Sequence, residues 1–151
     1  MIFYKNSIPC SHCRSGMNER AIKYAVEHFH LPLCWKCQDW YKQKITKTTH
    51  EAILLYLSLK NRYVPVELEK TDGDKTIDIA VTDARVNIEI DRKHRPTNPQ
   101  QAFTDLHNAT YSIDKGFITL RIPNTLVKHY PDETADYITR FLNSSRQLRT
   151  A

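Results

Sequence analysis

Three acidic residues and a lysine recur at alternate positions along one stretch of the chain, where together they could hold a metal ion. Asp78 lies within a run of alternating apolar and polar residues, and Glu89, Asp91 and Lys93 continue this pattern in the next run. Alternation of period two is typical of β-strands with one face packed on a core, so these charged residues are expected on the opposite face. Carboxylates that converge there repel one another unless a cation joins them, and a divalent metal with an activated water would make the cluster hydrolytic. A solvated outer face explains the same spacing without any chemistry.

Four cysteines form the second candidate site. They occur as two C-x-x-C pairs with twenty residues between them. A two-residue turn lets each pair hold one edge of a tetrahedral ion, with each sulfur about 2.3 Å from a Zn²⁺. Two disulfides or reactive thiols are the alternatives, but the chain shows no secretory signal, and a redox C-x-x-C is usually single and beside a βαβ unit. The sequence therefore predicts a structural zinc site formed by Cys10, Cys13, Cys34 and Cys37.

Residues 1–45 are predicted to form a separate zinc-binding module. A helix capped by Asn18 is expected between the two cysteine pairs. The module is rich in lysine, arginine and aromatic residues, a combination that suits contact with nucleic acid. Alternatively, the aromatic residues fill the very small core around the metal, and we expect this for Trp35. His12 and the other histidines of the module are expected at the surface, because four thiolates already close a structural zinc site.

The composition bounds the class of protein and its partners. The chain has 151 residues, 40% of them hydrophobic, which is enough for one domain or for a small module plus a compact one. Its net charge of +5 and its pI of about 9.0 suit a polyanionic partner such as nucleic acid. No apolar run approaches the roughly 20 residues that span a membrane, and the N-terminus lacks a signal-peptide pattern, so we expect a cytoplasmic protein with no membrane partner.

Residues 46–151 are predicted to form a compact domain around the acidic hairpin, which is the pair of strands that carry Asp78 and Glu89. A helix is expected to begin at Thr48, with Glu51 either as its capping partner or as an acid that faces the metal site. A second helix is expected to begin at Pro99. Its buried stripe is predicted to contain Phe103, Leu106, Thr110 and Ile113. The predicted strands cover 63–69, 76–81, 86–91 and 117–122, and a last helix covers 132–143.

This order of elements predicts a mixed α/β fold. The three consecutive strands should form an antiparallel meander. The fourth strand should return through a helical crossover and pair in parallel with an inner strand. Helices are then expected on both faces of the sheet.

The ordered set of motifs resembles the core of the PD-(D/E)xK, or restriction-endonuclease-like, nucleases. The matching stretches are the helix at 48–59, Ile77-Asp78-Ile79-Ala80-Val81, Ile88-Glu89-Ile90-Asp91-Arg92-Lys93-His94, and 116–124. Within that superfamily the chain is most similar to small nucleases related to the very-short-patch repair endonucleases. The likeness covers about residues 48–143, roughly two thirds of the chain. Arg92 departs from the pattern in place of a glycine, Ile77 in place of a proline, and His94 comes one residue early.

The resemblance implies a Mg²⁺- or Mn²⁺-dependent endonuclease that hydrolyses phosphodiester bonds, with DNA favoured over RNA and with the zinc module aiding substrate binding. Asp78 and Glu89 would hold the metal, which lowers the pKa of a bound water and offsets charge in the transition state. Asp91, Lys93 or His94 would orient that water or donate a proton to the leaving oxygen. Two alignments stay open. In the first, which we prefer, Glu89 is the metal acid and Asp91 takes the usual lysine position; in the second, Asp91 and Lys93 form the acid–lysine pair.

Two other functions fit the same residues. A chain that kept the fold without catalysis would only bind nucleic acid. A zinc-stapled interaction or regulatory protein would use the acidic hairpin merely as a charged face. Salt-sensitive binding without cleavage would support the former, and no nucleic-acid binding at all would support the latter. A homodimer would be favoured for an enzyme that cuts both strands.

Overall fold

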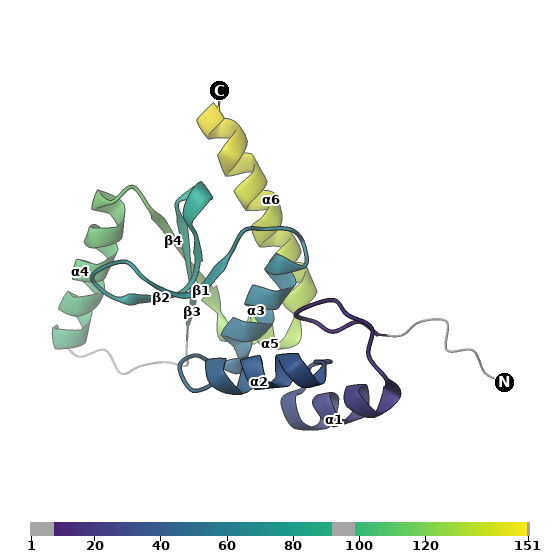
Figure 1. Ribbon diagram of the computed structural model, residues 1–151. Coiled ribbons are helices and arrows are strands. Elements are labelled where there is room, and N and C mark those ends of the chain that lie inside the picture. Colours follow the sequence, from purple (N-terminus) through teal and green to yellow (C-terminus); the bar gives the residue numbers. More distant parts are fainter. Residues whose placement is uncertain (1–7, 92–98, 151) are drawn as a thin grey trace. The chain divides into compact units, whose positions relative to one another are not determined.

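The computed structural model describes residues 8–91 and 99–150, except the side chains of residues 101, 102, 109 and 145–150 (Figure 1). The chain divides into two compact units after Lys47, where the sequence placed the junction after residue 45. Each unit has its own buried residues. None of the described helices is both long and apolar enough to cross a membrane.

The first unit contains two helices, α1 (Glu19–Phe29) and α2 (Trp35–Lys44). The predicted cap of α1 is confirmed, because Asn18 Oδ1 accepts a hydrogen bond from the Ala21 N–H at 2.7 Å. The sequence did not reveal α2, whose buried positions are occupied by a cysteine, a glutamine and a tyrosine rather than by an apolar stripe. The prediction that Trp35 fills the core is wrong, because its side chain is 51% exposed. It opens α2 at the surface, and the core is filled instead by smaller apolar residues together with Phe29 and Tyr41, whose rings meet edge to face.

The second unit is a mixed α/β domain with a four-stranded sheet. Its strands are β1 (Glu67–Thr71), β2 (Thr76–Val81), β3 (Val86–Asp91) and β4 (Ile118–Pro123), in the spatial order β1-β2-β3-β4. The first three strands form the predicted antiparallel meander, and β4 pairs in parallel with β3. The helices of this unit are α3 (His50–Lys60), α4 (Pro99–Asp114), α5 (Asn124–His129) and α6 (Pro131–Thr150), and a 3-10 turn at Thr82–Ala84 joins β2 to β3.

The helices cover the two faces of the sheet unequally. Residues of α3, α5 and α6 pack with Ile79, Val81, Val86, Ile88 and Ile90 in one hydrophobic core. Helix α4 lies on the opposite side of the sheet from α3 and α6 (Figure 1). The face that carries Asp78 and Glu89 is therefore the α4 face. It is not a freely solvated surface, because Ala80 and Asn87 on the same face are buried.

Three local predictions for this unit are wrong. Thr49, not Thr48, caps α3, since its hydroxyl accepts a hydrogen bond from the Ala52 N–H at 3.2 Å. Strand β1 begins at Glu67 rather than at Tyr63, because the chain leaves α3 through a turn in which Tyr63 has a left-handed φ of 61°. The last strand is followed by the short α5, and the last helix is longer than predicted.

The orientation of α4 also differs from the prediction, although its start at Pro99 is confirmed. The stripe that was expected to be buried lies in solvent, with Phe103 72%, Leu106 59% and Ile113 70% exposed, and Thr110 exposed as well. The side of α4 that is covered instead carries Tyr111 and Ser112. The hydroxyl of Tyr111 donates a hydrogen bond to the Asp72 carbonyl at 3.2 Å, so α4 is held against the β1–β2 turn by a polar contact.

Candidate functional site

The four cysteines of the first unit lie close enough together to hold one metal ion such as zinc. Their sulfur atoms are all within 4.8 Å of one another, and none forms a disulfide. A tetrahedral Zn²⁺ with Zn–S bonds of about 2.3 Å places its sulfurs about 3.8 Å apart. The Sγ atoms of Cys13 and Cys34 are 3.7 Å apart, so the cluster has the dimensions that a tetrathiolate site needs.

Backbone hydrogen bonds hold the two cysteine pairs in place. The first pair sits on a turn closed by the Arg14 N–H to the Cys10 carbonyl at 3.0 Å and by the Cys10 N–H to the Ser15 carbonyl at 2.9 Å. The second pair starts α2, where Cys34 is the N-cap residue. Thiolates are stabilised at a helix N-terminus by the exposed N–H groups and the helix dipole. The Cys34 N–H also points at the sulfur of Cys10, 3.4 Å away, and so links the two pairs.

The thiols differ in how readily they ionise. The Ser15 hydroxyl, 3.0 Å from the sulfur, lowers the pKa of Cys13 to about 6 by hydrogen bonding its thiolate. Burial raises the pKa of Cys37, because the charged thiolate loses solvation. A metal that binds here must displace the proton of Cys37, and this makes metal binding release protons.

His12 lies against the cysteine cluster rather than free at the surface. Its Nδ1 is 3.3 Å from the sulfur of Cys37, and its ring stacks on Trp40 with the centroids 4.0 Å apart. Such a contact orients a ligand from outside the coordination shell. The sequence gave no sign of it, because the partners of His12 are about 25 residues distant in the chain.

The acidic residues of the second unit meet where β2 and β3 separate. Ile79 pairs with Ile88 at the end of the β2–β3 ladder, and the same register places Asp78 opposite Glu89. Directly opposite residues have Cβ atoms about 5 Å apart. Beyond the last backbone pair, the Asp78 side chain replaces a backbone carbonyl as the acceptor, since its Oδ2 accepts a hydrogen bond from the Ile90 N–H at 3.0 Å. The two carboxylates are thus cross-strand neighbours at an opening of the ladder.

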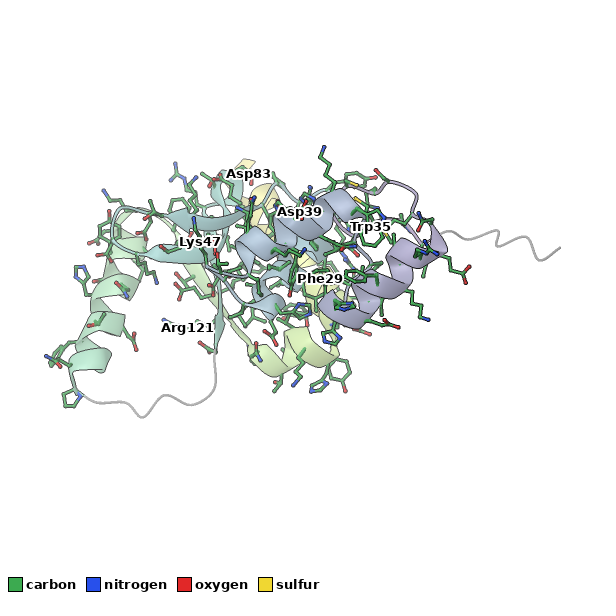
Figure 2. All side chains as sticks on the ribbon, turned by 60° about the horizontal axis from the view of Figure 1, so that its bottom comes forward. Phe29, Trp35, Asp39, Lys47, Asp83 and Arg121 are labelled. Atoms are coloured by element: carbon green, nitrogen blue, oxygen red, sulfur yellow. The ribbon has the colours of Figure 1, made fainter. Side chains whose placement is uncertain are left out.

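Two cations reach these acids from neighbouring elements. Lys75 Nζ is 2.5 Å from Glu89 Oε1, and the two side chains are only 17% and 16% exposed. Arg121, which is aligned with Glu89 in the parallel β3–β4 register, lies 3.6 Å from Glu89 Oε2 and 3.3 Å from Asp91 Oδ1. Figure 2 shows Arg121 extending from β4 toward the side of the sheet where α4 lies. These cations offset the repulsion that carboxylates on neighbouring strands would otherwise exert on one another.

Sequence reasoning did not assign a role to Lys75. This residue precedes β2 and reaches across to β3, so no spacing within either strand signals its contact with Glu89. Arg121 stood in a matching motif but without a role at the site. The only usable signal was the number of acids on one face, which requires cations from elsewhere in the fold.

The remaining candidate residues lie apart from this pair or outside the described chain. Glu51 is half-buried in the first turn of α3, and α3 packs on the opposite face of the sheet from Asp78. Lys93 and His94 lie outside the described residues. Within the described ranges, the four cysteines alone form a group of three or more metal-ligating side chains with their ligand atoms close together.

Comparison with protein-family models, with curated proteins and with solved structures finds no match for this chain. The chemistry of both sites therefore rests on their own geometry.

Proposed function

We propose that the chain is a metal-dependent endonuclease that hydrolyses DNA phosphodiester bonds, with a restriction-endonuclease-like second unit and a zinc-binding first unit that aids substrate binding. The observation that carries the proposal is the pairing of Asp78 and Glu89 across the opened end of the β2–β3 ladder. The sheet order supports it, because an antiparallel meander followed by a parallel β4 is the arrangement that the resemblance implies.

The two carboxylates suit a magnesium ion. Mg²⁺ prefers hard oxygen ligands and is usually held by one or two carboxylates together with waters and substrate phosphates. Asp78 and Glu89 offer those two carboxylates, with Mn²⁺ as the alternative ion. A metal held there would supply an activated water and offset charge on the phosphorane-like transition state.

The protein's own cations fit a site for a phosphodiester. Lys75 and Arg121 lie beside Glu89. Their positively charged N–H groups can donate hydrogen bonds to the oxygens of a phosphate. The Lys75 contact supports the first alignment of the third strand. Glu89 then has a lysine partner even though Asp91 occupies the usual lysine position. Contributions from Lys93 and His94 stay predictions.

The same ion pairs favour a second candidate function. Lys75 and Arg121 form ion pairs with Glu89 and Asp91 and so balance their charge. A chain that bound nucleic acid without cutting it would use these cations in place of the metal. Cleavage of supercoiled plasmid in Mg²⁺ or Mn²⁺ separates the two functions, since the endonuclease nicks DNA and the inactive protein only retards it in a gel. A homodimer and a cytoplasmic location stay predictions.

Replacing Lys75 by methionine distinguishes a metal site from a permanent salt bridge. The change leaves Glu89 short of a buried partner, so the free energy of unfolding in metal-free buffer should fall by about 1–3 kcal/mol. If Mg²⁺ binds at Glu89, millimolar Mg²⁺ should raise the Tm of the variant more than that of the wild type, since a ligand that binds only the folded state stabilises it.

Differential scanning fluorimetry with and without Mg²⁺ measures both effects. Lys128→Met, at an exposed position on α5, is the matched control and should change neither the stability nor its response to Mg²⁺. Equal responses to Mg²⁺ in the Lys75 variant and the wild type would argue for the inactive protein.

The first unit supports nucleic-acid binding through an exposed aromatic cluster. Tyr24 stacks on His28 at 3.9 Å between ring centroids and lies 5.4 Å from Trp35, and both Tyr24 and Trp35 are exposed. Residues 8–47 contain seven lysine and arginine residues against three acidic residues. Exposed rings among basic residues bind unpaired bases by stacking and the backbone by charge.

Trp35→Ala is therefore expected to weaken binding of single-stranded oligonucleotides by roughly 5- to 150-fold, since stacking of one base contributes about 1–3 kcal/mol. Fluorescence anisotropy at two salt concentrations measures the loss, and the slope against salt should stay unchanged because no charge is removed. Tyr137→Ala on α6, which removes a more exposed ring, should bind as the wild type does. Wild-type affinity of the Trp35 variant would remove the stacking role.

A further inference from the structure

A pocket of about 390 Å³ lies between α4 and the sheet, beside the candidate metal site. Ligand pockets commonly measure about 300–1,000 Å³, so this one is large enough for a small organic molecule. Its floor includes Ala80 of β2 and Asn87 of β3, which pair with each other across the two strands. The covered side of α4 contributes Tyr111 and Ser112. We propose that this pocket binds a single nucleotide, with its base between the sheet and α4.

Two buried polar side chains line the pocket. Ser112 is 3% exposed, and its hydroxyl has no hydrogen-bond partner among the described residues. Asn87 is 4% exposed, and its carboxamide also lines the pocket. Buried polar groups are normally paired, so an unpaired hydroxyl in a pocket that also holds a carboxamide indicates a polar ligand. A carboxamide donates and accepts at once, and the edge of a nucleobase offers an acceptor beside a donor.

The other lining residues match the remaining parts of a nucleotide. Tyr111 and Phe117 supply flat apolar surface for a base. The ring of Tyr111 is held in place by its hydrogen bond to the Asp72 carbonyl. Lys115 supplies positive charge for a phosphate, and its ammonium lies 5.5 Å from the centre of the Tyr111 ring. The ammonium of Lys70, by contrast, is ion-paired with Glu67 at 3.1 Å. Aromatic surface, a carboxamide and a lysine together select a nucleotide over an apolar ligand or an inorganic anion.

The position of the pocket gives it a role in the proposed cleavage. Asn87 and Glu89 lie on the same face of β3, two residues apart, which is about 7 Å along a strand. Resting on the proposed function, we infer that the substrate presents an unpaired nucleotide next to the cleaved bond, because a base within a duplex cannot enter the pocket.

Binding of deoxynucleoside 5′-monophosphates to the full chain, measured by isothermal titration calorimetry without Mg²⁺, tests the pocket. Asn87→Leu keeps the approximate size of the side chain and removes its hydrogen bonds, so affinity should fall about tenfold or more. Asn143→Leu, on the exposed end of α6, is the matched control and should bind as the wild type does. Circular dichroism and zinc content show whether each variant is folded.

Lys115→Gln gives a second test at an exposed position where misfolding is not expected. It should weaken binding of the monophosphate several-fold while leaving binding of the nucleoside unchanged. The proposal is overturned if the wild type binds no nucleotide at millimolar concentration, if inorganic phosphate competes fully while nucleosides do not bind, or if folded Asn87→Leu binds normally. Plasmid nicking without nucleotide binding would overturn the pocket alone, whereas nucleotide binding without nicking would overturn the nuclease alone.

Discussion

Replacing Asp78 by asparagine should reduce Mg²⁺-dependent nicking of plasmid DNA by about 10³-fold or more while leaving the protein folded. The fold should survive because the asparagine Oδ1 can still accept the hydrogen bond from the Ile90 N–H that Asp78 Oδ2 accepts at 3.0 Å. Activity should be lost because the neutral side chain holds the metal poorly, and the metal supplies several kcal/mol of transition-state stabilisation. Asp78→Ala is a poorer test, since it also leaves that N–H unpaired.

Glu89→Gln should have a similar effect on nicking for the same reason, although it also breaks the ion pair with Lys75. Glu133→Gln removes an exposed acid from the first turn of α6 and serves as the control for the loss of one negative charge. Rates are measured from the conversion of supercoiled to nicked circles, and thermal unfolding checks the fold of each variant. Full activity of Asp78→Asn or Glu89→Gln would exclude the proposed metal site, as would an equal loss in Glu133→Gln.

Replacing Cys37 by serine should remove the metal and unfold the first unit. A unit of this size buries too little apolar surface to be stable alone, and small metal-binding modules owe about 10–16 kcal/mol of apparent stability to zinc. Cys37 is buried, so the serine hydroxyl would be a buried polar group without a metal to bind, which costs further stability. Native mass spectrometry should show one zinc fewer, and limited proteolysis should cut within residues 8–47 while sparing the second unit.

Ser15→Ala is the matched control for this change. It removes the hydroxyl beside Cys13 but keeps all four sulfurs, so zinc and the fold of the first unit should be retained. Retention of one zinc by Cys37→Ser together with normal protease resistance would contradict the four-cysteine site. Treatment of the wild type with a zinc chelator should reproduce the behaviour of the Cys37 variant.

The local features of this chain were readable from the sequence, because short-range patterns determine them. Two C-x-x-C pairs predicted a four-cysteine cluster, and the structure brings their sulfurs within 4.8 Å of one another. Alternation of period two predicted β2 and β3, and the order of elements predicted a meander with a parallel fourth strand. Asn18 and Pro99 marked the starts of α1 and α4 through capping chemistry that acts over one helical turn.

The tertiary structure alone decided which surfaces are covered. The apolar stripe of α4 shows that the helix is amphipathic, but only its contacts reveal that Phe103 faces solvent while Ser112 is buried. Trp35 was likewise expected in the core but is exposed, whereas the polar Asn87 is buried. The ion pair between Lys75 and Glu89 likewise joins residues whose spacing carries no signal. Periodicity reports the two faces of an element, whereas burial and charge pairing depend on neighbours distant in the chain, and these determine the chemistry of the site.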